Sequence, residues 1–145
     1  MTVTTTFEVL TEAECRRLLA EQEVGRVAFV DGEFPVVLPV NFDIDGDEIA
    51  IRTDLGSKLD RIPLHRVAFE VDGVEQWNHS GWSVLVQGFG QDVTDAVGLR
   101  YEDLRRRGLS TWPPGEKEHW VTIQIHRISG RRIVTRMGTS REVID

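Results

Sequence analysis

The sequence predicts a mainly β fold, a small closed or partly open barrel with helices at its ends. After Gly25, short β-rich runs alternate with turn signals, and only two segments have the periodicity of an amphipathic helix. At 145 residues the chain fits one domain, because ~100–200 residues per domain is usual. We therefore expect a single domain over residues 1–145, with six or seven strands, two helices and a helical turn.

The N-terminal segment is predicted to be a loose stretch followed by a helix. Residues 1–6 are mostly polar, and we expect them to be extended or loose. Thr11 is placed as an N-cap and Glu14 completes a capping box, which predicts a helix that runs to about residue 23. Apolar side chains at helical spacing predict a core-facing stripe of Cys15, Leu18 and Leu19.

The segment after this helix is typical of a meander of hairpins. The predicted strands are residues 26–30, 35–42 and 48–53. Between them lie an Asp-Gly pair ending at Gly32 and another ending at Gly46, which supply the positive φ angles of tight turns. Two prolines inside the second run predict an edge strand or a bulge there.

The rest of the chain predicts further strands and the second helix. A helical turn at residues 56–61 precedes a strand at 66–71, a loop at 72–81 and a central strand at 82–93. The second helix is expected at 96–107, with Asp95 as its cap and Gly108 as its stop. After a loop at 109–119, strands at 120–127 and 131–135 are expected to form a hairpin around Ser129 and Gly130.

Composition narrows the classes of function. A formal charge of −7 and a pI near 5.1 repel phosphate backbones and anionic lipid, so we expect neither nucleic acid nor a membrane as a partner. The single Cys15 excludes an intrachain disulfide, and no secretory signal or spanning apolar run is visible, so we expect a cytoplasmic protein. Four scattered histidines predict no metal site, and no P-loop, dinucleotide fingerprint or nucleophile elbow is present.

A candidate phosphate site lies where a predicted strand passes into the helical turn. Arg52 can supply a bidentate fork and Lys58 a point charge, while Thr53 and Ser57 can donate from their hydroxyls. The start of the helical turn adds unpaired backbone N–H groups. The alternative is that both cations are solvated surface charges and that Ser57 merely caps a turn.

Five short segments carry a resemblance to a known family: residues 24–29, 39–42, 51–59, 67–72 and 81–88. Their order resembles that of pyridoxamine 5'-phosphate oxidase-like, flavin-binding split-barrel proteins, over roughly residues 7 to 135. The chain looks most like the short, actinobacterial-type members. The resemblance implies a six-stranded split β-barrel homodimer with two flavin sites at the subunit interface.

The resemblance also implies which residues bind the cofactor, which we expect to be FMN, with the deazaflavin coenzyme as the alternative. Arg52, Thr53, Ser57 and Lys58 would grip the phosphate, beside Leu59. Pro39, Val40 and Asn41 would line the edge of the isoalloxazine ring. Trp82, Ser83 and Val84 would approach the flavin, in such families often from the partner chain. No catalytic side chain is implied.

By resemblance the protein is an oxidoreductase that passes hydride or electrons through the flavin to a small substrate. True pyridoxamine 5'-phosphate oxidases are longer and carry a C-terminal substrate-binding segment. We therefore do not expect this protein to oxidise pyridoxamine 5'-phosphate. Three alternatives stay open: a reductase dependent on the deazaflavin coenzyme, a non-enzymatic flavin or haem carrier or sensor, and a dimeric structural module without a cofactor.

Overall fold

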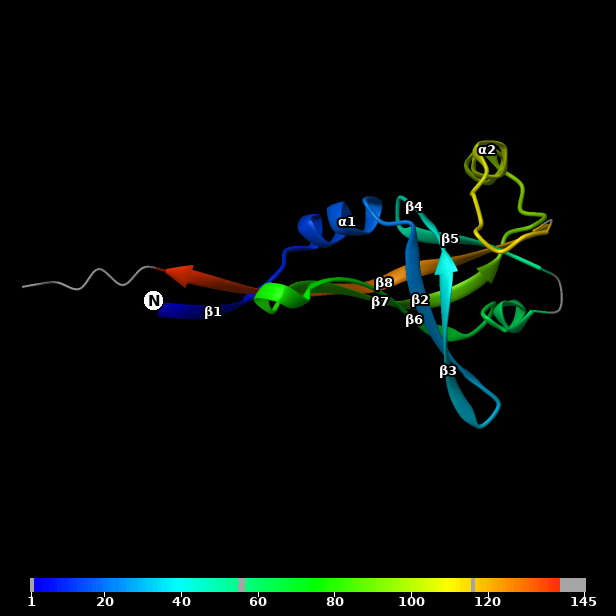
Figure 1. Cartoon of the computed structure of the whole chain (residues 1–145). Helices are drawn as coiled ribbons and strands as arrows, with labels where there is room; N and C mark the ends of the chain where they lie inside the picture. The colour runs from blue at the N-terminus through cyan, green and yellow to red at the C-terminus, as the bar shows by residue number, and fades with distance from the viewer. Residues whose placement is uncertain (1, 55–56, 116, 139–145) are drawn as a thin grey trace, which may run out of the picture.

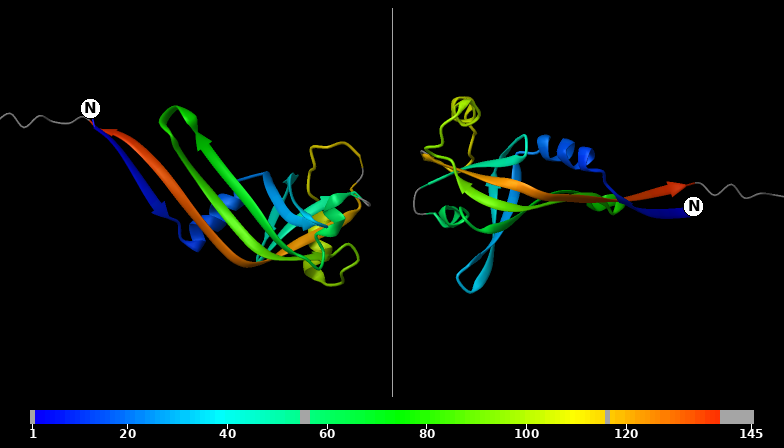
Figure 2. Two further views of the ribbon diagram at one scale, coloured as in Figure 1. Left: turned by 90° about the horizontal axis from the view of Figure 1, so that it is seen from below. Right: turned by 180° about the vertical axis from the view of Figure 1, so that it is seen from behind.

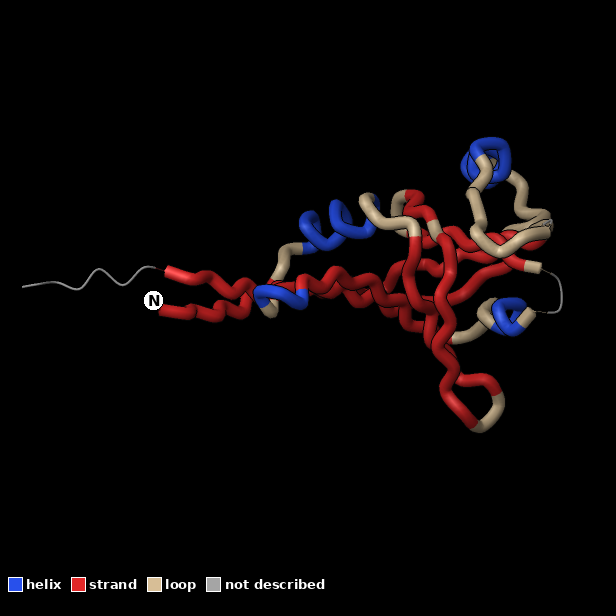
Figure 3. The backbone as a smooth tube through the Cα atoms, in the orientation of Figure 1, coloured by secondary structure: helices blue, strands red, loops and turns tan. Residues whose placement is uncertain are grey.

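A computed structural model of the chain describes residues 2–54, 57–115 and 117–138, and all eight strands within these ranges belong to one sheet (Figure 1). Two α-helices and two short 3₁₀ helices connect the strands (Figure 3). The elements in chain order are β1 (Thr2–Val9), α1 (Glu12–Ala20), β2 (Val24–Asp31), β3 (Phe34–Asn41), β4 (Asp43–Asp45), β5 (Glu48–Thr53), η1 (Lys58–Arg61), β6 (Arg66–Glu75), η2 (Gln76–Asn78), β7 (Ser80–Asp92), α2 (Leu99–Arg107) and β8 (His119–Gly138).

The sheet is antiparallel throughout and has the order β3-β2-β6-β7-β8-β5-β4, with β1 added to the far end of β8. It curls into a half-barrel, so that β3 and β5 come into contact although they are not neighbours in the sheet. At the other end β1, β8 and the β6–β7 hairpin extend away from the half-barrel as a long arm (Figure 2). The prediction of a mainly β split barrel is therefore confirmed.

The core lies inside the curl of the sheet. Phe69, Ile49 and Ile123 are fully buried there, and α1 adds Leu19 to the same cluster. A second, smaller cluster lies under α2, where Ala50, Val93, Leu104 and Trp120 are buried together. Both faces of β5 are therefore covered, which fixes the position of the polar residues at its end.

Several local predictions are confirmed. The Thr11 hydroxyl accepts a hydrogen bond from the backbone N–H of Glu14 at 3.2 Å, as an N-cap should. Gly32 and Gly46 have φ angles of 67° and 58° in their hairpin turns. The proline-bearing strand β3 is an edge strand of the sheet.

Two predictions about the ends of the described chain are wrong. Residues 2–6 are not loose, because they pair as β1 with the distal part of β8. Ser129 and Gly130 do not form a turn, because β8 continues through them. A Cβ on Gly130 would lie 2.6 Å from the Cys15 Sγ, so this glycine lets α1 pack closely on β8. Its role is close packing, which a sequence reading cannot distinguish from a turn.

Other boundaries also shift. The expected loop at 72–81 is mostly strand, since β6 runs to Glu75 and β7 begins at Ser80. Helix α2 begins at Leu99 with Gly98 as its N-cap, so Asp95 does not cap it. Helix α1 ends at Ala20, three residues before the position expected. Within the described residues, no helix is long and apolar enough to cross a membrane.

Candidate ligand-binding site

A cavity of about 590 Å³ opens beside the ends of β3 and β5, and we call it the loop cavity. This volume is within the range of small-molecule sites, which is ~300–1,000 Å³. Seven of the predicted site residues line it. The full lining is Val24, Pro39, Val40, Asn41, Arg52, Thr53, Asp54, Ser57, Leu59, Thr111, Trp112, Pro113 and Lys117.

Three separate parts of the chain form this lining. Strand β3 contributes its last residues, because the curl of the sheet brings β3 against β5. Strand β5 contributes its last two residues and leads into η1. The loop between α2 and β8, described at residues 108–115 and 117–118, closes the remaining side. We call this segment the α2–β8 loop.

Arg52 fastens the α2–β8 loop to the sheet. Its Nε and Nη2 donate to the backbone carbonyl of Lys117 at 3.2 and 2.7 Å, and its Nη1 donates to the carbonyl of Leu109 at 3.1 Å. The guanidinium also lies 5.1 Å from the centre of the Trp120 ring, a cation–π contact. The guanidinium group that was predicted to bind a phosphate therefore already donates hydrogen bonds to two backbone carbonyls.

Asn41 holds the same loop at a second point. Its Oδ1 accepts from the backbone N–H of Trp112 at 2.7 Å, and its Nδ2 donates to the carbonyl of Glu23 at 3.3 Å. The side chain is nearly buried, so both bonds lie in a place of low solvent access. Asn41 thus reaches the cavity, as predicted, and in addition holds the backbone that carries Trp112.

The hydroxyl groups lie together, whereas the predicted lysine lies apart. The Oγ1 of Thr53 and the Oγ of Ser57 share a hydrogen bond of 2.5 Å at the cavity wall. Lys58 is exposed at the start of η1 and is absent from the lining. Gly56, which was expected to bring the backbone close to a phosphate, lies outside the described residues.

Sequence reasoning missed Lys117, although it is the cavity's second cation. Its side chain is only 11% exposed, and its Nζ lies 2.5 Å from the Asp54 Oδ2 and 3.3 Å from the Pro114 carbonyl oxygen. No motif marks this lysine, because it belongs to a loop whose path is set by Arg52 and Asn41. Only the neighbouring tryptophan and prolines could have indicated a built loop there.

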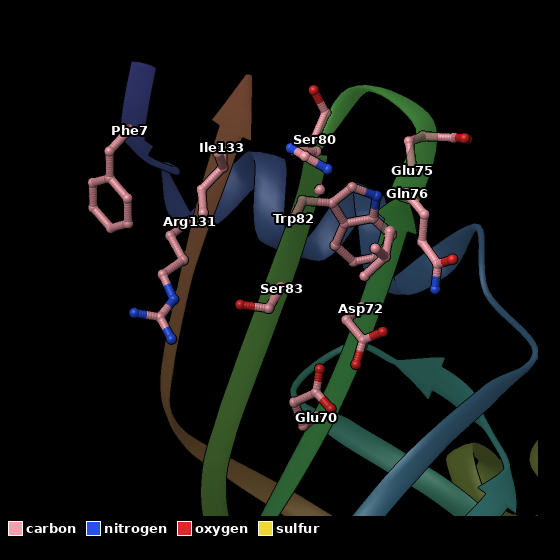
Figure 4. A pocket seen from close by; sticks show the side chains of 13 residues that line it. Phe7, Glu70, Asp72, Glu75, Gln76, Ser80, Trp82, Ser83, Arg131 and Ile133 are labelled. Carbon is pink, nitrogen blue, oxygen red and sulfur yellow. The ribbon is translucent and has the colours of Figure 1, made fainter. Parts of the chain in front are cut away.

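The remaining predicted residues lie elsewhere in the chain. Trp82 and Ser83 line a second, open cavity of about 880 Å³ on the arm, which we call the arm cavity (Figure 4). In Figure 4 they project from β7, beside Glu70 and Asp72 from β6. Val84 is fully buried in the core, so its side chain reaches neither cavity. Within one chain these three residues do not share a site with the other predicted residues.

The arm cavity has an unusual carboxylate. Burial, together with the neighbouring Asp72, raises the pKa of Glu70 from 4.5 to about 7, against the opposing effect of Arg26. The Arg26 Nη1 lies 3.0 Å from the Asp72 Oδ2 and 3.6 Å from the Glu70 Oε2. Arg26 therefore makes its closer ion pair with Asp72 and compensates the charge of Glu70 less.

The two cavities differ in the charge of the residues that line them. Among the described residues, the loop cavity is lined by two cations, Arg52 and Lys117, and one carboxylate. The arm cavity is lined by three carboxylates and Arg131, together with His79. An anionic ligand therefore suits the loop cavity, and its two hydroxyls and apolar wall suit a phosphorylated molecule with a flat, apolar part.

Comparison with known proteins now decides the family. The family model described as pyridoxamine 5'-phosphate oxidase matches residues 11–132 of the chain. The chain belongs to this family. The resemblance noted in the sequence is therefore confirmed.

Several known proteins are similar to this chain in sequence or in structure. An uncharacterized protein of Mycobacterium tuberculosis is 31% identical over 128 residues, 83% of this chain and 82% of that protein. The FAD binding protein of Mycobacterium smegmatis is 28% identical with a TM-score of 0.72, covering 86% of this chain and 98% of that chain. The fold of a FAD-binding protein of Mesorhizobium loti is also similar, at 23% identity and a TM-score of 0.71, covering 90% of this chain and 99% of that chain.

Proposed function

We propose that this family member binds a flavin in the loop cavity and transfers hydride or electrons through it to a small substrate. The observation that carries the proposal is the gathering of β3, β5 and the α2–β8 loop around one cation-bearing cavity of suitable volume. The flavin-binding relative from M. smegmatis, which spans most of this chain, supports the same ligand class. FMN is the form we expect, with FAD and the deazaflavin coenzyme as the alternatives.

The lining residues fit such a cofactor in two parts. The hydroxyls of Thr53 and Ser57 and the cations of the cavity would bind its phosphate. The apolar wall formed by Val40, Leu59 and Trp112 would exclude water from its ring. When bound, a flavin supplies the ring that accepts and donates hydride, so the chain needs to supply binding and orientation rather than an acid or a base.

We further propose that the protein acts as a homodimer in which the arm cavity of one chain faces the loop cavity of the other. The separation of Trp82 and Ser83 from the other predicted residues supports this, because a partner chain would bring them back to the flavin. Exposed apolar side chains on the arm support it as well: Phe7 is 58% exposed and Ile133 is 41% exposed. The mass measured by light scattering, with and without flavin, tests whether the protein is a dimer, and loss of flavin binding in Trp82→Ala tests whether the arm cavity contributes to the site.

Titration of the purified protein with FMN, FAD and the deazaflavin coenzyme, followed by tryptophan fluorescence, tests the binding proposal. Trp112 lines the cavity, so its emission should change when a flavin binds. Thr53→Val combined with Ser57→Ala should weaken FMN binding by roughly tenfold or more, because two hydrogen-bond donors to a phosphate are lost. Ser129→Ala removes a hydroxyl at an exposed position outside both cavities, and this control should bind normally. The proposal fails if none of the three molecules binds the wild-type protein.

A non-enzymatic flavin carrier or sensor is the second candidate. In the described lining of the loop cavity, the groups able to transfer protons are Asp54 and Lys117, and the two are paired with each other, which favours a protein that holds a cofactor without assisting proton transfer. Steady oxidation of NADH or NADPH by the flavin-loaded protein, with an electron acceptor present, distinguishes the two. Turnover supports the oxidoreductase, and a single stoichiometric reduction supports the carrier.

A further inference from the structure

We propose that Trp112 is the residue of the loop cavity that recognises the flat ring of the ligand, and that Asn41 positions it. The inference rests on the proposed function and deepens it, because it names the residue by which the cavity selects a ligand with an aromatic ring. The sequence predicted only a loop around Trp112, so this residue was not among the expected ligand contacts.

Trp112 is placed to bind a ligand and is not part of the core. It is 68% exposed, yet it lines the loop cavity. Among the described residues, its indole makes no hydrogen bond, ring contact or cation–π contact with any neighbour. Trp120 shows the contrast, because it is 5% exposed and packs under α2. An aromatic side chain that lines a cavity without such partners has a face available for the ring of a ligand.

The backbone that carries Trp112 is held at several points. The Asn41 Oδ1 accepts a hydrogen bond from the Trp112 N–H at 2.7 Å. Pro113, the next residue, restricts the backbone of Trp112 to extended conformations. Arg52 binds the carbonyls of Leu109, before Trp112, and of Lys117, after it. A ring that packs on this indole therefore has little loop entropy to overcome, which favours affinity.

Asn41 has the properties of a positioning residue. It is nearly buried, and its Nδ2 donates to the Glu23 carbonyl at 3.3 Å. This bond uses the donor end of the amide, so the Oδ1 end is the one that accepts from the Trp112 N–H. The orientation of the amide is thus set from the side of Glu23, and the amide in turn sets where Trp112 enters the cavity.

The composition of the lining assigns Trp112 to the ring of the ligand. Trp112 is the sole aromatic side chain among the described lining residues, and it shares the apolar wall with Val40 and Leu59. A ring that stacks on an indole buries apolar area on both partners, and aromatic pairs attract each other beyond that area. The contact depends on the ring alone, so it should be the same for every ligand that carries the same ring.

The first experiment changes Trp112 and measures the dissociation constants of FMN and riboflavin from the fluorescence of the flavin. Trp112→Ala should weaken the binding of both by the same factor, roughly 5–150-fold, because the stacking partner of the shared ring is lost. Trp112→Phe should restore most of the affinity, because it keeps an aromatic face. Phe34→Ala removes an exposed aromatic side chain outside the loop cavity and the arm cavity, and this control should bind both flavins as wild type does.

The second experiment is a double-mutant cycle on Asn41 and Trp112, with the FMN dissociation constant as its readout. Asn41→Ala should weaken FMN binding in the wild-type background and have a smaller effect in Trp112→Ala, because the two residues act together. Additive losses would contradict the positioning role of Asn41. Asn41→Ser, which is too short to reach the Trp112 N–H, takes its place in the cycle if Asn41→Ala does not fold.

The outcomes separate this inference from the proposed function. If flavins bind and Trp112→Ala keeps their affinities, the inference is overturned and the proposed function stands. A loss that affects FMN and spares riboflavin also overturns it, because the contact is then not to the ring. If FMN binds and riboflavin does not, an FMN affinity in Trp112→Phe as low as that in Trp112→Ala overturns it. If no flavin binds the wild-type protein, the proposed function fails and this inference fails with it.

Discussion

At the scale of single residues, Arg52 fits the pattern of a phosphate-binding residue but holds a loop in the structure. Its position at the end of a strand and before a Ser-Lys pair predicts a bidentate contact to a phosphate, yet in the structure it binds two loop carbonyls and lies over the ring of Trp120. Arg52→Lys keeps the charge but cannot reproduce the planar fork. We expect the variant to lose about 1–3 kcal/mol of stability and to be cleaved faster by chymotrypsin near Trp112. Arg66→Lys, at an exposed position, is the control, and equal cleavage of both variants would contradict the role given to Arg52.

Glu70 makes the stability of the protein depend on pH. Because burial and Asp72 raise its pKa in the folded chain from 4.5 to about 7, the folded state binds the proton more tightly than the unfolded state. This group therefore destabilises the fold progressively as the pH rises from about 4.5 to about 7. We expect Glu70→Gln to unfold at a higher temperature than wild type at pH 8 and to differ little from it at pH 4. Glu75→Gln, an exposed neighbour in the same cavity, should show no such pH-dependent gain.

At the scale of elements, the packing of α1 on β8 depends on the missing side chain of Gly130. An added Cβ would lie 2.6 Å from the Cys15 Sγ and 3.1 Å from the Ser83 carbonyl oxygen. We expect Gly130→Ala to cost about 1–3 kcal/mol, the usual range for overpacking, in urea unfolding. Adding Cys15→Ala should recover part of this loss, so the two changes should not be additive. Gly138→Ala, whose Cβ would meet only ordinary contacts, is the control, and an equal effect there would argue against close packing as the cause.

The same elements show what the sequence could and could not predict. The cap at Thr11, the turns at Gly32 and Gly46 and the proline edge strand were predicted, because each depends on residues close in sequence. The pairing of β1 and the uninterrupted course of β8 were not, because they depend on partners far along the chain. The same holds for the candidate site. The hydroxyls of Thr53 and Ser57 could be predicted, because they are close together in the sequence at the end of a strand. The position of Lys117 could not, because it depends on how the α2–β8 loop is held in the folded chain.

At the scale of the whole molecule, the arm carries apolar surface that the single chain does not cover. Phe7 lines the arm cavity while 58% exposed, so it adds little to the core of its own chain. We expect Phe7→Glu to shift light-scattering mass from dimer to monomer with little change in the far-ultraviolet circular dichroism. Leu64→Glu introduces the same charge at an exposed apolar site outside the arm, and it should leave the mass unchanged. A monomeric wild-type protein would contradict the dimer from the start.

The pairing of β1 with β8 also has a consequence for how the chain folds during its synthesis. Thr5 and Thr135, whose hydroxyl oxygens lie 3.3 Å apart, are separated by 130 positions in the sequence. The ribosome delivers β1 long before its partner strand, so Val3, Phe7 and Val9 leave the exit tunnel as an unpaired apolar edge. We therefore expect β1 to stay without its partner strand, and open to pairing with other strand edges, until β8 has been synthesised.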